Sequence, residues 1–357
     1  MTEQAALRPS IGSHGATRLP AVTVEGYNAE LRDEDDQFLG DRASNRALHD
    51  IIEELRARIR EVDEDPLGDD SSEGFGSKKL DEVMKEGSLE ARGVIQAATE
   101  AFSKELAKVI RRFLRLKAWR DVERLAVGGG LSGSSVGELA IGRTAIELKT
   151  AGTAIELSPI HHPPDEAGLV GAVQLAPRWV FESFDAILAL DIGGTKMRAG
   201  VVQLNLEKTP DLSAACVWKY EVWRHRDEKP TRDQAVERLA GMLSSLAKRA
   251  EREGLRLAPF IGIGCPGMIQ EDGYISRGAQ NLPGNWETTR FNLPRRLHEA
   301  IPAIGGHETT VVMHNDAVVQ GLSEVPFMQD VARWGIFTIG TGLGNAVFAN
   351  RSTEAKG

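Results

Sequence analysis

Residues 186–205 read AILALDIGGTKMRAGVVQLN. Two apolar runs flank a pair of glycines, and this pattern predicts a strand, a tight turn and a second antiparallel strand. Glycine has no Cβ and adopts positive φ angles, so such a turn can direct backbone N–H groups toward anionic oxygens. Asp191 ends the first strand, where it could organise Mg²⁺ directly or through water. The turn that follows consists of Gly193, Gly194, Thr195 and Lys196.

Two further glycine clusters follow predicted strands. Residues 334–350 (WGIFTIGTGLGNAVFAN) predict a second hairpin, whose turn has the same chemistry but no acidic residue. Residues 124–134 (RLAVGGGLSGS) predict a buried strand that ends in glycines before a helix. Each cluster alone is typical of an ordinary tight turn, and none fits a P-loop or a dinucleotide-binding fingerprint. The candidate nucleotide contacts in these clusters are Gly129, Gly130, Gly340, Thr341 and Gly342.

An amide and a carboxylate, Asn315 and Asp316, follow the apolar strand predicted over residues 309–314. A carboxylate at a strand-to-helix turn can accept a proton from a substrate hydroxyl. An asparagine offers both a donor and an acceptor to sugar hydroxyls. Both residue types also favour helix N-caps, so capping is the competing explanation for the pair.

The remaining periodicity indicates a mixed α/β protein. Residues 1–35 combine Gly, Pro, Ser and acidic residues without periodicity and predict a poorly ordered arm. A third antiparallel strand is predicted over 217–225 and another buried strand over 260–267. Apolar residues at helical spacing predict helices over 43–62, 78–87, 88–117, 134–152, 165–176 and 231–254.

Composition excludes several classes of protein. The 357 residues carry a net charge of −9, which argues against a protein that binds nucleic acid. The two cysteines, Cys216 and Cys265, lie far apart and rule out a disulfide scaffold or a thiolate zinc site. No apolar run approaches the roughly 20 residues of a membrane span. The N-terminus also lacks the pattern of a signal peptide, so we expect a cytoplasmic protein.

Taken together, the motifs resemble those of the ROK family of sugar kinases and regulators, within the actin-like ATPase superfamily. They occur in the family's order over residues 186–350, which makes the resemblance specific. The segments that carry it are ALDIGGTKMRAGVV (189–202), IGIGCPGMI (261–269), AQNLPGNW (279–286), VVMHNDA (311–317) and TIGTGLGN (338–345).

The resemblance implies an ATP- and Mg²⁺-dependent kinase that phosphorylates a hydroxyl group of a sugar-like small molecule. By this analogy Asp316 is the catalytic base, Asp191 organises Mg²⁺, and the two hairpins hold the ATP phosphates. Gly129 and Gly130 correspond to the turn that approaches adenosine. The residues implied to line the sugar pocket are Asn281, Asn315 and Gly267.

The order of the segments differs from the family's. The segments around Gly129 and residues 159–176 resemble the family's C-terminal part, yet they precede residues 186–205. We therefore expect a circularly permuted, two-lobed actin-like ATPase (ribonuclease H-like) α/β fold, since permutation is tolerated where native termini lie close together. The expected domains are an arm (1–35), a nucleotide-binding lobe (36–180 with 330–352) and a smaller sugar and phosphate lobe (186–325).

Part of the family's sugar-recognition set has no counterpart in this sequence, namely a Glu-x-Gly-His segment and a cysteine-rich zinc site. Asp41, Arg42, Asn45 and His49 are candidates to replace it, although an ordinary solvated helix start explains them equally well. A non-catalytic sugar or nucleotide sensor therefore stays open as the alternative to a kinase. The segments before residue 186 resemble lobe elements rather than a winged helix, so we expect no nucleic acid partner; a homodimer stays open.

Overall fold

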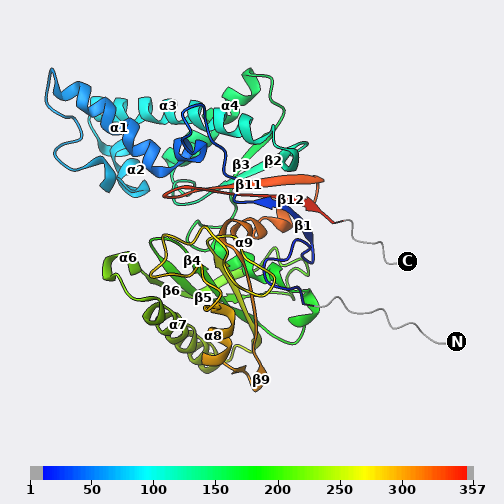
Figure 1. Cartoon of the computed structure of the whole chain (residues 1–357). Coiled ribbons are helices and arrows are strands. Elements are labelled where there is room, and N and C mark those ends of the chain that lie inside the picture. The colour runs from blue at the N-terminus through cyan, green and yellow to red at the C-terminus, as the bar shows by residue number, and fades with distance from the viewer. Residues whose placement is uncertain (1–10, 352–357) are drawn as a thin grey trace. The chain divides into compact units, whose positions relative to one another are not determined.

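The computed structural model describes residues 11–351, which divide into two compact units. Unit 1 contains the described residues up to Val24, together with Glu166–Gln329, Asn350 and Arg351. Unit 2 contains Glu25–Asp165 and Asp330–Ala349. Each unit is mixed α/β and has its own five-stranded sheet (Figure 1). The mixed α/β class predicted from the sequence is therefore confirmed.

The sheet of unit 1 has the order β10-β7-β4-β5-β6. Strands β4 and β5 form the antiparallel hairpin that the glycine turn predicts, and β6 pairs with β5 as the expected third antiparallel strand. Strands β7 and β10 run parallel to β4. The strands span β4 Ala186–Ile192, β5 Met197–Gln203, β6 Cys216–Trp223, β7 Leu257–Cys265 and β10 Thr310–Asn315.

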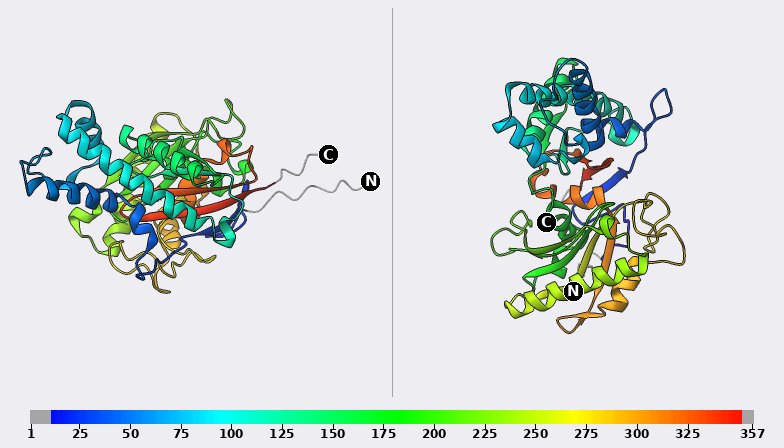
Figure 2. Two further views of the ribbon diagram at one scale, coloured as in Figure 1. Left: turned by 90° about the horizontal axis from the view of Figure 1, so that it is seen from above. Right: turned by 90° about the vertical axis from the view of Figure 1, so that its left-hand side faces the viewer.

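Helices cover both faces of this sheet. On one face lie α7 (Arg232–Arg252) and α8 (Leu293–Ala300), visible in Figure 2. Helix α7 starts at a capping box made by Thr231 and Gln234, and it buries leucines at helical spacing. On the other face pack α5 (Ala167–Gly171), the 3-10 helix η4 (Ala172–Leu175) and α9 (Asp316–Leu322).

Residues 166–180, which the sequence analysis assigns to the expected nucleotide-binding lobe, lie in unit 1. The reason is the packing of α5, which contacts β4, β5 and α9 through small residues. A Cβ added to Gly171 would lie 1.7 Å from the Val319 carbonyl oxygen, so α5 and α9 approach as closely as the backbones allow. The short elements α6 (His225–Glu228), β8 (Ala303–Ile304) and β9 (His307–Glu308) complete the unit.

The sheet of unit 2 has the order β1-β12-β11-β2-β3. Strands β11 (Arg333–Ile339) and β12 (Leu343–Asn350) form the second predicted hairpin, and β2 (Arg124–Gly128) runs parallel to β11 and to β3 (Glu156–Pro159).

Strand β1 (Val22–Tyr27) lies within the residues expected to form an irregular arm. The expectation is wrong for this part of the arm because β1 pairs with β12, more than 300 residues away in the sequence. The expected arm's residues 1–10 lie outside the described residues.

The described residues of unit 2 contain four α-helices, which pack against one another and share a hydrophobic core with the sheet. They match the helices predicted from the periodicity, and serine side chains cap three of them by accepting a backbone N–H. Phe113 of the longest of these helices meets the rings of Trp119 and Phe337 edge to face, and those two rings form a tilted contact with each other. The helices span α1 Asn45–Arg60, α2 Ser77–Glu86, α3 Leu89–Phe113 and α4 Ser135–Thr150.

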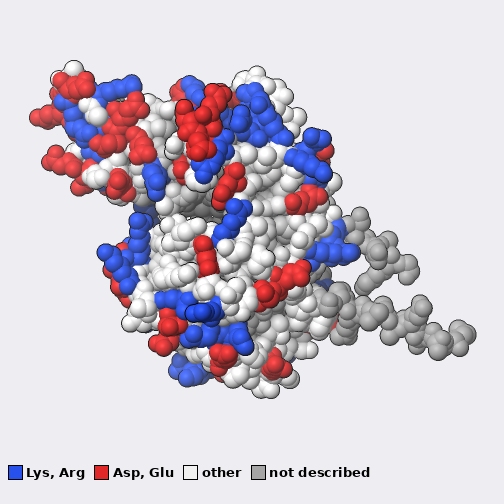
Figure 3. All heavy atoms as spheres, viewed as in Figure 1, with Lys and Arg blue, Asp and Glu red and all other residues white. Residues whose placement is uncertain are grey.

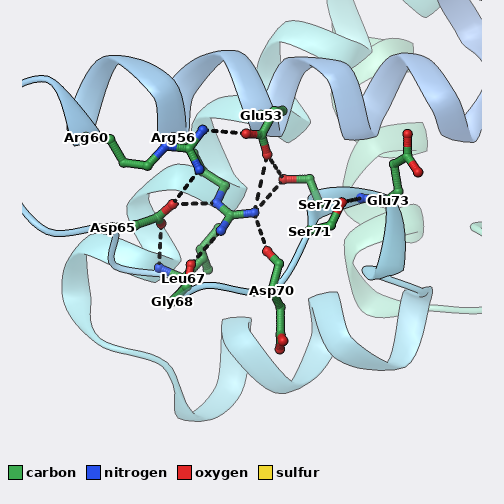
Figure 4. A network of polar contacts seen from close by, with 10 residues as sticks. All are labelled: Glu53, Arg56, Arg60, Asp65, Leu67, Gly68, Asp70, Ser71, Ser72 and Glu73. Atoms are coloured by element: carbon green, nitrogen blue, oxygen red, sulfur yellow. Dashed lines mark hydrogen bonds and ion pairs between the residues drawn. The ribbon is translucent and has the colours of Figure 1, made fainter.

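A buried arginine holds the loop between α1 and α2 (Figure 4). Arg56 is 1% exposed, and Nε donates to Asp65 at 2.8 Å. Its terminal nitrogens donate to the carbonyl oxygens of Gly68 and Asp70 and to the Ser72 hydroxyl at 2.6–2.8 Å. A buried guanidinium is tolerated only when its donors are satisfied, and these acceptors satisfy it. The loop therefore folds around Arg56.

The surface carries charges of both signs, interspersed on the face that Figure 3 shows. Several form pairs along helices, such as Arg58 with Glu54 and Lys104 with Glu100. Within residues 11–351, none of the helices combines the length and the apolar character needed to cross a lipid bilayer.

Candidate functional site

The candidate site of unit 1 lies where three parallel strands end. Asp191 near the end of β4 pairs in register with Gly264 of β7, and Asn315 at the end of β10 pairs with Cys265 of β7. Carboxyl ends of parallel strands share one edge of a sheet, and ligands of open α/β sheets bind at this edge. The sheet therefore brings Asp191 and Asp316, 125 positions apart in sequence, to one edge.

Asp316 is the first residue of α9 and is partly buried. Desolvation raises the pKa of its carboxyl group to about 7, and the negative charge of Asp191 adds to this rise. Hydrogen bonds from the backbone and from the Asn315 amide act in the opposite direction. A carboxyl group that changes protonation near neutral pH is suited to accept a proton from a substrate.

Asn315 is fully buried, and its side-chain amide is saturated within the protein. Nδ2 donates to the Gly267 carbonyl oxygen at 3.1 Å and to Asp316 Oδ1 at 3.0 Å. Oδ1 accepts the N–H groups of the first turn of α9, so the side chain caps that helix. A direct substrate contact by this amide would require one of these bonds to break. The geometry instead makes Asn315 a link between the Gly267 turn and the Asp316 carboxylate.

Asp191 is 8% exposed and forms an ion pair with Arg198, whose Nη1 donates to Oδ2 at 2.9 Å. The two residues lie opposite each other in the β4–β5 hairpin. On its other side Asp191 is close to α5, because a Cβ on Gly168 would lie 2.7 Å from the carboxyl carbon. Asp191 is therefore held from two sides.

The glycine turn after Asp191 is closed by the Gly193 N–H, which donates to the Lys196 carbonyl oxygen at 2.9 Å. The Gly193 carbonyl oxygen lies 2.9 Å from His225 Nε2. Asn281 lies against the turn, since a Cβ on Gly194 would be 2.9 Å from the Asn281 Cβ. Within the described residues, no protein acceptor is recorded for the N–H groups of Gly194 and Thr195.

Unit 2 brings the other two glycine clusters together. Gly128 of β2 pairs with Thr338 of β11, and Gly129 adopts a φ of +94° with its Cα against the Ile339 backbone. A side chain at Gly129 would collide, since its Cβ would lie 2.2 Å from the Ile339 carbonyl oxygen. The turn of the second hairpin is closed by the Gly340 N–H, which donates to the Gly342 carbonyl oxygen at 3.0 Å.

The start of α1 adjoins these turns through one of the four candidate sugar ligands. The Asn45 N–H donates to the Gly340 carbonyl oxygen at 2.9 Å, and its side chain lies beside Gly130. His49 instead bonds the Phe75 carbonyl oxygen at 3.0 Å, and Arg42 pairs with Asp33. Asp41 is exposed.

Comparison with known proteins follows this geometry. Residues 187–354 match the model of the ROK family. This part of the chain is therefore similar to the ROK family. No curated protein matches the sequence.

Solved structures that resemble the chain cover only part of it. They include a ROK hexokinase from Thermus thermophilus (28% identity, TM-score 0.31, 45% of this chain and 46% of that chain). A proposed N-acetylmannosamine kinase from Listeria monocytogenes matches at 25% identity and a TM-score of 0.33, over 46% of this chain and 47% of that chain. A proposed sugar kinase from Cytophaga hutchinsonii matches at 21% identity and a TM-score of 0.34, over 46% and 48%. The chain thus matches about half the length of each.

The ROK segment contains most of the residues singled out from the sequence. In unit 1 the structure groups Asp191, the turn 193–196, Gly267, Asn281 and the pair 315–316. In unit 2 it groups the turn 340–342 of the ROK segment with Gly129 and Gly130, which lie outside that segment. That both groups serve one nucleotide stays a prediction.

Three residues at the candidate site of unit 1 were not identified from the sequence. Arg198 could have been found from the hairpin, because a four-residue turn at 193–196 places residue 198 opposite Asp191. Gly168 is marked only by a run of small residues. No motif marks His225, which lies 32 positions beyond the Gly193 carbonyl group that it contacts.

The residues at the candidate site of unit 1 fit a magnesium-bound nucleotide. Within residues 11–351, no group of three or more His, Cys, Asp or Glu side chains could hold a metal ion. Mg²⁺ does not require such a cage, because it commonly binds one or two carboxylates together with phosphate oxygens and water. Asp191 would supply the carboxylate, and the N–H groups of Gly194 and Thr195 would supply donors for anionic oxygens.

The Cys265 side chain does not act as a nucleophile in this arrangement. It is fully buried, and burial together with the charges of Asp316 and Asp191 raises the pKa of the thiol well above its usual value. The thiol therefore stays protonated at neutral pH, and the thiolate is the nucleophilic form.

Proposed function

We propose that this chain is an ATP- and Mg²⁺-dependent kinase that phosphorylates a hydroxyl group of a sugar or sugar-like molecule. The observation that carries the proposal is Asp316, whose carboxyl pKa of about 7 is suited to a general base at neutral pH. Its position beside Asp191 at the carboxyl ends of parallel strands, and the ROK match over residues 187–354, support the reaction class.

In this mechanism the ionised Asp316 accepts the proton of the substrate hydroxyl. The hydroxyl oxygen bonds to the γ-phosphorus, and the bond from that phosphorus to the β–γ bridging oxygen breaks. ADP leaves with the bonding electron pair, and the proton remains on Asp316. Asn315 holds the carboxylate in position through its Nδ2–H, while the helix cap fixes Asn315 itself.

Asp191 would hold Mg²⁺, and the ion pair with Arg198 orients the Asp191 carboxylate. Bound Mg²⁺ neutralises part of the negative charge of the phosphate oxygens. The N–H groups of Gly194 and Thr195 bind phosphate oxygens in the proposal, and Lys196 adds a positive charge beside them. The proposed nucleotide contacts from unit 2 are Gly129, Gly130, Gly340, Thr341 and Gly342.

For the acceptor, Asn281 is the best-supported sugar contact. It is exposed and lies directly against the Gly194 turn. Gly267 adopts a φ of +105°, and its carbonyl oxygen accepts a hydrogen bond from Asn315, so the Gly267 turn and the base form one assembly. Asn315 acts on the sugar indirectly, through the Asp316 carboxylate.

We also infer that the chain is a circularly permuted actin-like ATPase fold. The support comes from the sheet of unit 2. Residues 25–165 precede the ROK match (187–354) in the sequence, yet their strands share this sheet with β11 and β12, which lie near the end of the match. A circular permutation would explain how a nucleotide-binding lobe is built from both ends of one chain.

The test is an ATP-consumption screen over hexoses, amino sugars and N-acetyl sugars, with Mg²⁺ present. The proposal predicts that at least one sugar is converted to a sugar phosphate in equal amounts with ADP. ATP binding with no turnover for any sugar would contradict the kinase and favour the non-catalytic sensor.

A further inference from the structure

His225 contacts the glycine turn from outside the turn itself. It is 2% exposed and follows β6, where its ring lies 5.8 Å from the Trp223 ring. Its Nε2 lies 2.9 Å from the Gly193 carbonyl oxygen. A carbonyl oxygen only accepts hydrogen bonds, so Nε2 carries a hydrogen and the imidazole is the donor.

This hydrogen bond controls the direction of the Gly194 N–H. The Gly193 carbonyl group and the Gly194 N–H belong to the same trans peptide plane, where they point in opposite directions. A donor that fixes the carbonyl on the His225 side therefore turns the Gly194 N–H to the other side. The Gly193 N–H is fixed separately by the Lys196 carbonyl oxygen, so both peptide planes of Gly193 are held.

The turn in unit 2 has the same arrangement. The Gly340 N–H is bound within its hairpin, and the Gly340 carbonyl oxygen accepts a hydrogen bond from outside it, from the Asn45 N–H. In both turns an external donor holds the carbonyl group of the first glycine. In unit 2 the donor is a backbone group, but in unit 1 it is a side chain, so the effect can be removed by substitution.

We propose that His225 is a positioning residue that aims the Gly194 N–H at the phosphate oxygens of a nucleoside triphosphate. The proposal rests on the proposed function, since it assumes that the turn binds phosphates. A group held in place before the ligand arrives needs no reorientation on binding, and this preorganisation favours both affinity and rate. His225 itself need not touch the nucleotide.

The test compares His225→Leu, which has no donor, with His225→Gln, whose side-chain amide keeps an N–H donor. His298→Leu is the matched control, because His298 also bonds a backbone carbonyl oxygen, that of Thr309 at 2.9 Å, but lies on α8. The probe is N-methylanthraniloyl-ATP with Mg²⁺, whose dissociation constant is measured by fluorescence on the full chain. Thermal unfolding is measured in parallel for each variant.

We expect His225→Leu to weaken nucleotide binding about tenfold and to lower kcat/KM for ATP about 10–100-fold, with little change in KM for the sugar. His225→Gln restores most of both values, and His298→Leu leaves both unchanged. If His225→Leu acted only by lowering the stability of the chain, His225→Gln would not restore the affinity for ATP. If His225→Leu does not fold, the comparison of His225→Gln with the shorter His225→Asn replaces it, and asparagine is expected to bind nucleotide more weakly.

Two results would overturn the proposal: a folded His225→Leu variant with wild-type nucleotide affinity, or a glutamine variant no better than leucine or asparagine. The binding readout separates this failure from that of the kinase itself. If no sugar is phosphorylated but the leucine variant still binds nucleotide more weakly, His225 keeps its role and only the kinase proposal fails. If the wild-type chain binds no nucleotide, both proposals fail.

Discussion

Asp191 and Asp316, the two carboxyl groups of the candidate site in unit 1, act on each other through their charges. Asp191 is paired with Arg198, whereas Asp316 is desolvated and lies close enough for the Asp191 charge to raise its pKa. Two carboxyl groups with different surroundings can take different roles, one as a charged ligand for a cation and the other as a proton acceptor. The difference between the two environments is the residue-level basis of the proposed mechanism.

The pKa of Asp316 predicts the pH dependence of activity. The base works only when ionised, so kcat/KM should rise about tenfold per pH unit below neutrality and level off above a midpoint near pH 7. Steady-state rates between pH 5.5 and 8.5, with Mg²⁺ and the accepted sugar, measure this midpoint for the free enzyme. A flat profile between pH 5.5 and 8.5 would contradict a base with a raised pKa.

The elements of the fold were largely predictable, because long periodic segments dominate them. The pattern of residues 88–117 indicates a helix, and the structure has α3 over Leu89–Phe113. Strand β1 was not predictable, since its six residues gain their stability from β12 near the other end of the chain. Local patterns carry no information on such a distant partner.

The same contrast applies to the candidate site. Asp191, Asp316 and the turn 193–196 were identified from local motifs, and the structure brings them to one edge of the sheet. Gly168 and His225 were missed, because their importance lies in what packs against them. Neither a close approach to Asp191 nor a bond to the Gly193 carbonyl group leaves a local pattern in the sequence.

The packing of α5 predicts the effect of Gly168→Ala. Its Cβ would lie 2.7 Å from the Asp191 carboxyl group, so Asp191 must move, and we expect kcat/KM to fall about 10–100-fold. The matched control is Gly241→Ala in α7, where a Cβ meets no atom within 4 Å. That change should leave activity intact and stabilise the chain by about 0.5–1 kcal/mol. Full activity of Gly168→Ala would contradict the tight packing on Asp191.

The loop between α1 and α2 depends on Arg56 (Figure 4). Replacing it with methionine leaves the Gly68 and Asp70 carbonyl groups without their donor, and we expect a loss of about 3 kcal/mol in the free energy of unfolding. Hydrogen exchange of residues 62–76 should rise at the same time. Arg58→Met is the control, because its pair with Glu54 is exposed and contributes little. An unchanged loop and melting temperature in Arg56→Met would refute this role.

On the scale of the whole molecule, chain order and spatial order differ. In unit 2, Asn345 accepts a hydrogen bond from the Ala29 N–H at 2.9 Å and donates to the Ala29 carbonyl oxygen, so residues 316 positions apart are joined. A division of the chain by sequence order would separate these partners. The circular permutation that we infer gives such long-range pairing a simple origin, since it moves segments along the chain without moving them in space.

The most direct test of the kinase with Asp316 as its base is the Asp316→Asn variant. Phosphate transfer from γ-labelled ATP to the accepted sugar and N-methylanthraniloyl-ATP binding are measured on the same preparation. Asparagine keeps the oxygen that accepts from Asn315 but cannot take the proton. We predict that transfer falls at least about 100-fold while nucleotide affinity stays within about threefold of wild type. A variant that binds nucleotide and transfers phosphate at the wild-type rate would contradict the account.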